Sequence, residues 1–352
     1  MDVTAYRLGR NNIMYQIYRA TGSDMGGTKV NDAFVVFLEN IIGKEVVEMF
    51  KQECPIGWLQ LMCEFDKKKK GVRNIPNERL SIQLPHSMHK VHKKVIGKEL
   101  EDVINSKQMT GVKFAECLII SHEIIHEIYE KAVTGIVGHM DLRMRSSDLA
   151  NISHIIMVGG FSESSILQAE VKRRFGKRNI SVVVPSDAGL CVLKGGVMFG
   201  HAPSVIQNRI CRLTYGRRVG VRYDPRKHGK DKSRVTEWDG VEYQRGIFRA
   251  IVRKGESIKV GEVKKFLGTP VSGDQIEIAN ELYCTEEDDV SYCDDPGVQF
   301  VGKWLTPLEG EGLNRELETR FLFGETEIIC QSRQKGQKNW VEAVYDFHVS
   351  DR

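Results

Sequence analysis

Apolar side chains follow a helical period in the first part of the chain and a two-residue period in the last part. One early set has the i, i+3, i+4, i+7, i+8 spacing of an amphipathic helix: Phe34, Phe37, Leu38, Ile41 and Ile42. After residue 208, short alternating segments are separated by turns rich in Gly, Asp, Asn and Lys. The pattern therefore predicts an α/β fold class for residues 1–203, followed by a β-rich, sandwich-like domain over residues 204–352.

The same patterns predict further elements. We expect a hairpin over residues 2–20, a strand around Ile82 and Leu84, a helix over 44–70 with a break at Pro55–Gly57, and a long helix over 113–140. In the last part, the predicted strands are Val219–Tyr223, Ile247–Val252, Gln275–Ile278, Val298–Val301, Phe321–Cys330 and Trp340–Phe347.

Ile152–Gly176 has the sequence of a strand, a glycine pair and a helix. Gly159 and Gly160 allow a tight turn, and Ser162 is predicted to cap the helix that follows. Such a turn directs backbone N–H groups and the positive end of a helix dipole toward one point, which suits a phosphate. On the pattern alone, an ordinary strand–helix turn without a ligand remains an open alternative.

A second glycine pair occurs at Gly26 and Gly27, followed by Thr28. It also joins a predicted strand to a predicted helix, for which Asn31 or Asp32 is the expected cap. Two such junctions in one domain are able to hold a phosphate chain from two sides. This repetition strengthens the prediction of a phosphate site.

Composition excludes several classes of protein. The 352 residues, 41% hydrophobic and 28% charged, are typical of a globular chain with two domains. No apolar run is long enough for a membrane span, and no hydrophobic signal segment begins the chain, so we expect a cytoplasmic protein. Eight cysteines without a CxxC pair favour reduced thiols, and a net charge of +4 makes no case for nucleic-acid binding.

The segment from His122 to His126 matches the HExxH pattern of zinc proteases. Two histidines one helical turn apart bind zinc in that pattern, and the glutamate acts as a base. The longer form of the motif needs Gly and His where this chain has Tyr129 and Ala132. A zinc protease is therefore a remote alternative, and we assign neither metal ligands nor catalytic residues from the sequence.

Four segments taken together resemble the heat shock 70 kDa protein family of the actin-like ATPase superfamily, and within it the protein 12A/12B-like branch. They are RATGSDMGGTKVNDAF at 19–34, CEFDKK at 63–68, MVGGFSESSILQAEVKRRF at 157–175 and PSDAGLCVLKGGVMFG at 185–200. The resemblance covers residues 1–203 and is only positional beyond them.

The resemblance implies the ribonuclease H-like second lobe of an actin-like ATPase over 1–203, and a β-rich substrate-binding-like domain over 204–352. It also implies ATP or ADP and Mg²⁺ as cofactors, chaperone activity in the stress response, and unfolded or extended protein segments as partners. The residues it implies are Gly26, Gly27 and Thr28 at the phosphates, Glu64, Lys67 and Lys68 at the ribose and adenine, and Gly159, Gly160 and Ser162 at the adenosine slot.

The chain departs from the family pattern at several positions. Lys68 and Glu163 stand where the family has arginine, and Lys29 stands where an aspartate near the magnesium is expected. In the family, the first lobe supplies an Asp-Gly hairpin and a lysine for the phosphates, and a glycine-rich loop precedes a segment like the one that follows Met1 here. We therefore expect an ATP-binding chain with weak or absent hydrolysis by itself, and a non-catalytic protein-interaction module is the alternative.

Overall fold

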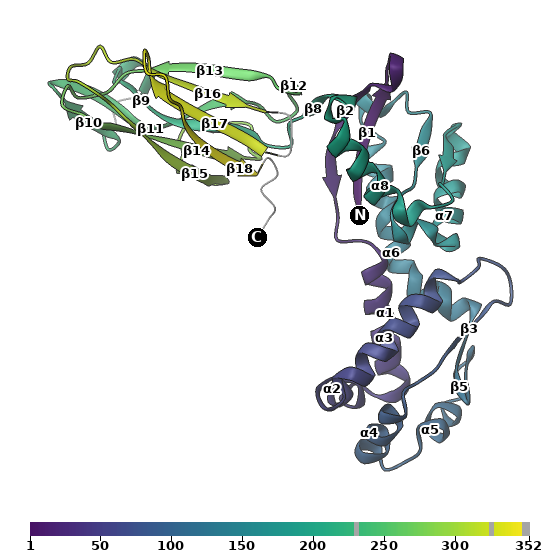
Figure 1. Ribbon diagram of the computed structural model, residues 1–352. Coiled ribbons are helices and arrows are strands. Elements are labelled where there is room, and N and C mark those ends of the chain that lie inside the picture. The colour runs from purple at the N-terminus through teal and green to yellow at the C-terminus, as the bar shows by residue number, and fades with distance from the viewer. Residues whose placement is uncertain (229–231, 324–326, 347–352) are drawn as a thin grey trace. The chain divides into compact units, whose positions relative to one another are not determined.

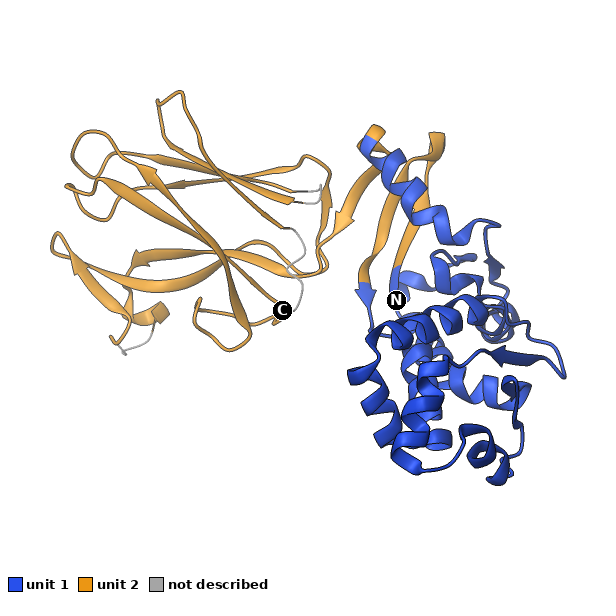
Figure 2. Cartoon of the chain, turned by 60° about the horizontal axis from the view of Figure 1, so that its bottom comes forward, with its two compact units in different colours: residues 1–3, 21–200 blue, residues 4–20, 201–352 orange. Residues whose placement is uncertain are grey.

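The computed structural model describes residues 1–228, 232–323 and 327–346 of a mixed α/β chain. The chain divides into two compact units, coloured separately in Figure 2. Unit 1 comprises Met1–Val3 and Thr21–Gly200, and unit 2 comprises Thr4–Ala20 and His201–Arg352. Among the described residues, no helix combines the length and apolarity that crossing a bilayer requires.

Unit 1 is mainly helical (Figure 1). Its helices are α1 (Gly27–Ile42), α2 (Lys44–Glu53), α3 (Pro55–Lys70), α4 (His86–Ile96), α5 (Leu100–Ser106), α6 (His122–Arg143), α7 (Ser165–Phe175) and α8 (Ala188–His201). Its strands form an antiparallel sheet in the order β3 (Arg79–Ile82), β5 (Cys117–Ser121), β4 (Val112–Ala115), and a parallel pair of β6 (His154–Ile156) and β7 (Ser181–Val183).

The core of unit 1 is built around α1. The predicted apolar face of this helix is buried, and Phe34 and Leu38 have no exposed surface. Phe34 stacks on Phe65 of α3 with ring centroids 3.9 Å apart. Burying a side chain of this size contributes about 1.5–3 kcal/mol, so the apolar stripe fixes which side of α1 faces inward.

The predicted helix over 113–140 is wrong in its first part. Residues 112–121 form the hairpin of β4 and β5, and α6 begins at His122. Phe114 and Leu118 are paired across this hairpin, whose turn places Glu116 at a φ of 60°. A spacing of four satisfies a helix face, but it also fits two strand residues that face each other across a tight turn. Periodicity alone did not separate these two cases.

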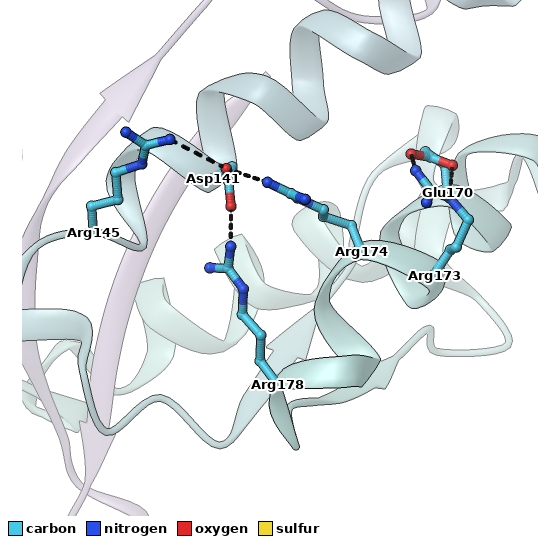
Figure 3. Close-up of polar contacts among 6 residues, drawn as sticks. All are labelled: Asp141, Arg145, Glu170, Arg173, Arg174 and Arg178. Carbon is cyan, nitrogen blue, oxygen red and sulfur yellow. Dashed lines mark hydrogen bonds and ion pairs between the residues drawn. The ribbon is translucent and has the colours of Figure 1, made fainter.

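Asp141 joins the C-terminal ends of α6 and α7 (Figure 3). Its carboxylate accepts a hydrogen bond from Arg174 at 2.6 Å and another from Arg178, and lies 3.8 Å from Arg145. The hydrogen bond from Arg174 holds the pKa of Asp141 below its usual range. These contacts hold α7, which follows the second glycine turn, against α6.

Unit 2 is mainly strands, and its described helical turns are α9 (Pro225–His228) and the 3₁₀ turns Arg10–Asn12 and Pro203–Val205. In the described residues its sheets have the orders β1-β2-β8-β12, β10-β11-β9-β14-β15 and β13-β16-β17-β18. The strands are β1 (Asp2–Leu8), β2 (Met14–Gly22), β8 (Ile206–Ile210), β9 (Thr214–Arg222), β10 (Val235–Trp238), β11 (Val241–Val252), β12 (Ser257–Lys259), β13 (Val263–Gly268), β14 (Glu277–Thr285), β15 (Val298–Pro307), β16 (Leu317–Leu322), β17 (Glu327–Gln334) and β18 (Val341–Asp346).

The five-stranded sheet and the sheet β13-β16-β17-β18 share one hydrophobic core. Trp304 of β15 meets Phe321 of β16 edge to face, with centroids 6.0 Å apart, and donates its indole N–H to Ser332 of β17 at 2.8 Å. The predicted strand Phe321–Cys330 covers the end of β16 and the start of β17. Residues 324–326 of that prediction, and Phe347 of the next one, lie outside the described residues.

Candidate functional site

The first glycine turn connects β2 to α1. The helix begins at Gly27, directly after Gly26, and no side chain caps it. Asn31 and Asp32 lie inside the first turns of the helix, so the prediction that either one caps it is wrong. The N–H of Lys29 donates to Gly26 O at 3.1 Å, and because no side chain caps this helix end, the N–H groups of Gly27 and Thr28 are open to an external acceptor.

The second glycine turn connects β6 to α7. Gly159 has a φ of +90°, a conformation that favours glycine. A short 3₁₀ turn, Gly160–Glu163, lies between Gly159 and α7. The cap of α7 is Ser164, whose hydroxyl accepts a hydrogen bond from Leu167 N at 3.4 Å. The predicted cap Ser162 is wrong: its hydroxyl donates to the carbonyl of Val158 at 2.7 Å. The extra turn moves the start of the helix beyond the reach of Ser162.

Both glycine turns border one pocket of about 280 Å³, which we call the glycine-turn pocket. Its lining comprises Gly27, Thr28, Asn31, Asp66, Lys69, Lys70, Tyr129, Gly160, Phe161 and Ser164. Three residues expected from the sequence are therefore brought together: Gly27, Thr28 and Gly160. Six others lie outside this lining: Gly26, Glu64, Lys67, Lys68, Gly159 and Ser162. The roles of all nine toward a ligand stay predictions.

The lysines at the end of α3 differ in exposure, because successive residues of a helix point in different directions. Lys69 is buried, whereas Lys67 and Lys68 are exposed, and Lys68 lies 3.5 Å from Glu64. Sequence reasoning missed Lys69. The signal was present, because Phe65 and Leu61 lie four and eight residues before Lys69 on the same buried face of the helix.

Lys69 is held by three oxygen atoms around the pocket. Its Nζ donates to Gly27 O at 3.0 Å and Asn31 Oδ1 at 2.6 Å, and it lies 2.6 Å from Asp66 Oδ1. The hydrogen bond from Lys69 is the main reason why the pKa of Asp66 lies below its usual value. Two ammonium groups against one carboxylate, together with the N-terminus of α1, give the pocket a positive character that suits an anion.

Tyr129 and Phe161 form the apolar wall of the glycine-turn pocket. Their ring planes are inclined by 27°, with centroids 6.3 Å apart. Burial raises the pKa of the Tyr129 hydroxyl, which stays protonated and donates to the carbonyl of Lys69 at 2.7 Å. A Cβ at Gly27 would stand 3.5 Å from both Lys69 Nζ and the Phe161 ring, so a large side chain at position 27 would occupy the pocket.

A larger pocket of about 540 Å³, which we call the α6–α7 groove, contains part of the HExxH segment. His126 lies 3.0 Å from Asn74 Oδ1, and Glu123 accepts from Ser121 at 2.6 Å. The rings of His122 and His126 are 4.2 Å apart. In the part of the chain that the structure describes, no three His, Cys, Asp or Glu side chains are placed to hold a metal ion. Nothing here supports the zinc protease.

Comparison with known proteins gives relatives but no family model, since none matches the chain. Heat shock 70 kDa protein 12A from Mus musculus is 32% identical over 339 residues, covering 94% of this chain and 50% of that protein. Heat shock 70 kDa protein 12B from Homo sapiens is 30% identical over 360 residues, covering 99% and 52%. A mitochondrial-type heat shock protein 70 from Encephalitozoon cuniculi is 23% identical over 245 residues, 68% of this chain and 35% of that protein. The chain spans about half the length of the first two relatives.

Proposed function

Because the chain belongs to the heat shock 70 kDa protein family, in the branch of proteins 12A and 12B, we propose that unit 1 binds ATP or ADP in the glycine-turn pocket. The observation that carries this proposal is the meeting of Gly27 and Gly160 in one pocket, although they are far apart in the sequence. Backbone N–H groups of α1 and the charge of Lys70 would face phosphate oxygens, and Phe161 offers an apolar surface to the ribose or base.

The size of the pocket limits how much of the nucleotide it encloses. Ligand pockets usually measure about 300–1,000 Å³, and this one measures about 280 Å³. It therefore accommodates part of a nucleotide, and the rest would extend past its rim. Glu64, Lys67, Lys68, Gly159 and Ser162 lie outside the lining, so the pocket gives no support to the roles that the family resemblance implies for them.

Magnesium fits this proposal as part of the ligand. Of the described lining residues, Asp66 alone is a carboxylate, and Lys69 already neutralises it. Mg²⁺ binds through one or two carboxylates together with substrate phosphates, so we propose that it enters with the nucleotide and neutralises phosphate charge there. Because the lining offers no side chain placed as a base for water, we propose weak or absent hydrolysis by this chain.

At the level of the fold, we propose that residues 1–203 form the second lobe of an actin-like ATPase and that residues 204–352 form a substrate-binding-like, β-rich domain. Phe300 and Leu305 of β15 are 57% and 43% exposed, and β15 ends the five-stranded sheet. An edge strand with exposed apolar side chains suits an extended protein segment. This favours chaperone-like or non-catalytic protein binding by unit 2. The cytoplasmic location stays a prediction.

Calorimetry of the full chain with ATP tests the nucleotide proposal, with and without Mg²⁺. We expect submillimolar binding that Gly27→Val weakens at least tenfold, because the valine side chain fills the pocket. Gly138→Val is the matched control, since a Cβ at that position of α6 meets no atom within 4 Å. ATP binding weaker than millimolar, or equal effects of the two substitutions, contradicts the proposal.

The proposal for unit 2 has its own test. The full chain is titrated with extended peptides from an unfolded-protein library, beside a Phe300→Ser, Leu305→Ser variant. We expect the variant to lose peptide binding and to keep ATP binding, because the two side chains belong to unit 2. Unchanged peptide binding by the variant contradicts the role of β15.

A further inference from the structure

We infer that Asp66, Lys69 and Asn31 form a positioning unit for the glycine-turn pocket, and that Lys70 is the lysine that contacts the phosphates. This assignment rests on the proposed nucleotide binding. It differs from the one implied by the family resemblance, which selects Lys67 and Lys68. We base this assignment on the contacts between the last turn of α3 and the first turns of α1.

Lys69 is committed to the protein itself. Its side chain is 7% exposed, and an ammonium group has three protons to donate. Its oxygen neighbours within 3.0 Å are likewise three: Gly27 O, Asn31 Oδ1 and Asp66 Oδ1. Asn31 closes the unit, since its Nδ2 donates to Asp66 Oδ1 at 3.4 Å. No proton of Lys69 remains for a ligand, so its effect on a ligand is indirect.

The unit ties together the elements that border the pocket. Lys69 and Asp66 belong to the last turn of α3, whereas Gly27 and Asn31 belong to the first turns of α1. Tyr129 connects α6 to the same unit, because its hydroxyl donates to the carbonyl of Lys69. These contacts fix the direction of the open N–H groups of α1, and therefore the place where an anion is bound.

Among the lysines at the end of α3, Lys70 is the one whose ammonium group is available to a ligand in the pocket. Its side chain is 55% exposed and lines the pocket, and its Nζ lies 3.9 Å from Asp66 Oδ2, beyond hydrogen-bond distance. Asp66 is already neutralised by Lys69, so the charge of Lys70 is the uncompensated one at the pocket. Lys67 is also exposed in the same turn of α3, but it lies outside the lining.

Substitution of the two exposed lysines tests the contact. Lys70→Gln and Lys67→Gln each remove one charge from the last turn of α3, so they change the helix end and the net charge equally. We expect Lys70→Gln to weaken ATP binding by about fivefold to tenfold without changing adenosine binding, and Lys67→Gln to change neither by more than about twofold. Equal effects on ATP, or no effect of Lys70→Gln, overturn the assignment.

The positioning role is tested by Asn31→Ala and Lys69→Met, with circular dichroism to verify folding. We expect both variants to lower the ratio of ATP affinity to adenosine affinity, because a displaced α1 N-terminus affects the phosphates selectively. A purely structural role would leave this ratio unchanged, which overturns the positioning unit. Should Lys69→Met not fold, Asn31→Ala decides alone. If the unmodified chain binds neither ATP nor adenosine, the proposed function itself is wrong, and this inference is overturned with it.

Discussion

The glycine-turn pocket and the α6–α7 groove share Tyr129 but differ in how their residues come together. The smaller pocket joins residues from four distant parts of unit 1, and a buried lysine links two of them. The groove is larger and contains a recognisable motif, yet His126 and Glu123 already have polar neighbours beside them. The difference is that the local motif brings no third metal ligand to its groove in the described part of the chain, whereas four segments distant in the sequence meet at the smaller pocket.

The largest expected effect is the loss of stability on replacing the buried Lys69. Lys69→Met leaves Asp66, Asn31 and the carbonyl of Gly27 without their shared donor, so we expect a loss of about 2–3 kcal/mol in the free energy of unfolding. Arg173→Met, at an exposed ion pair beside the groove, is the control and should cost less than about 0.5 kcal/mol. Denaturant unfolding measures both, and equal losses would remove the distinction between the two regions.

Tyr129→Phe should have the next largest effect. The change removes the hydroxyl that donates to Lys69 O and keeps the ring that packs near Phe161. We expect a loss of about 1 kcal/mol in the free energy of unfolding and a weaker binding of ATP. Thermal unfolding and calorimetry measure the two changes. A variant as stable as the unmodified chain would show that the hydroxyl does not support the pocket.

The pH dependence of stability should separate Asp66 from Glu170. The pKa of each is lowered, mainly by hydrogen bonds from Lys69 and Arg173 respectively. A lowered folded-state pKa contributes stability above the unfolded value, about 3.9 for Asp and 4.3 for Glu, and this is lost as pH falls through the folded-state pKa. Because Lys69 is buried and Arg173 is exposed to screening by solvent, we expect Asp66→Asn to flatten the acid loss of stability more than Glu170→Gln does, measured by urea unfolding between about pH 5 and pH 2. The reverse order would contradict the ranking.

The smallest expected effect is that of zinc on the groove. Since His122 and His126 have no third ligand in the described part of the chain, dialysis against zinc and then against buffer should leave no stoichiometric metal. His126→Ala should behave in the same way as the unmodified chain. Metal analysis by mass spectrometry decides this, and one zinc per chain that the variant loses would restore the motif as a site.

Several local features followed from the sequence alone. The apolar spacing of α1 was sufficient because a buried helix face repeats every 3.6 residues. Both glycine turns were found because a strand pattern stops and a helix pattern starts on either side of them. A break near Pro55 was also expected, and it falls at Cys54, just before the predicted Pro55–Gly57, because proline is tolerated in the first turn of a helix but not in its interior. Each of these depends on neighbours within a few residues.

Other features were decided by the packing of distant segments. The hairpin of β4 and β5 was missed because Phe114 and Leu118 have a spacing that two structures share. The cap of α7 moved from Ser162 to Ser164 because a 3₁₀ turn intervenes. The sequence of the lysine run, Lys67–Lys70, does not distinguish its four side chains. The packing of α3 against α1 decides that Lys69 is the one that is buried.

The sequence by itself determined the buried face of α1, the two glycine turns and the kinship that its motifs suggested. Local periodicity and turn chemistry suffice for these, because they act over one or two turns of the backbone. Only the tertiary structure decided that Gly27 and Gly160 border one pocket and that Lys69 bridges α1 and α3. Such contacts depend on how buried surfaces fit together across the fold, which no short stretch of sequence encodes.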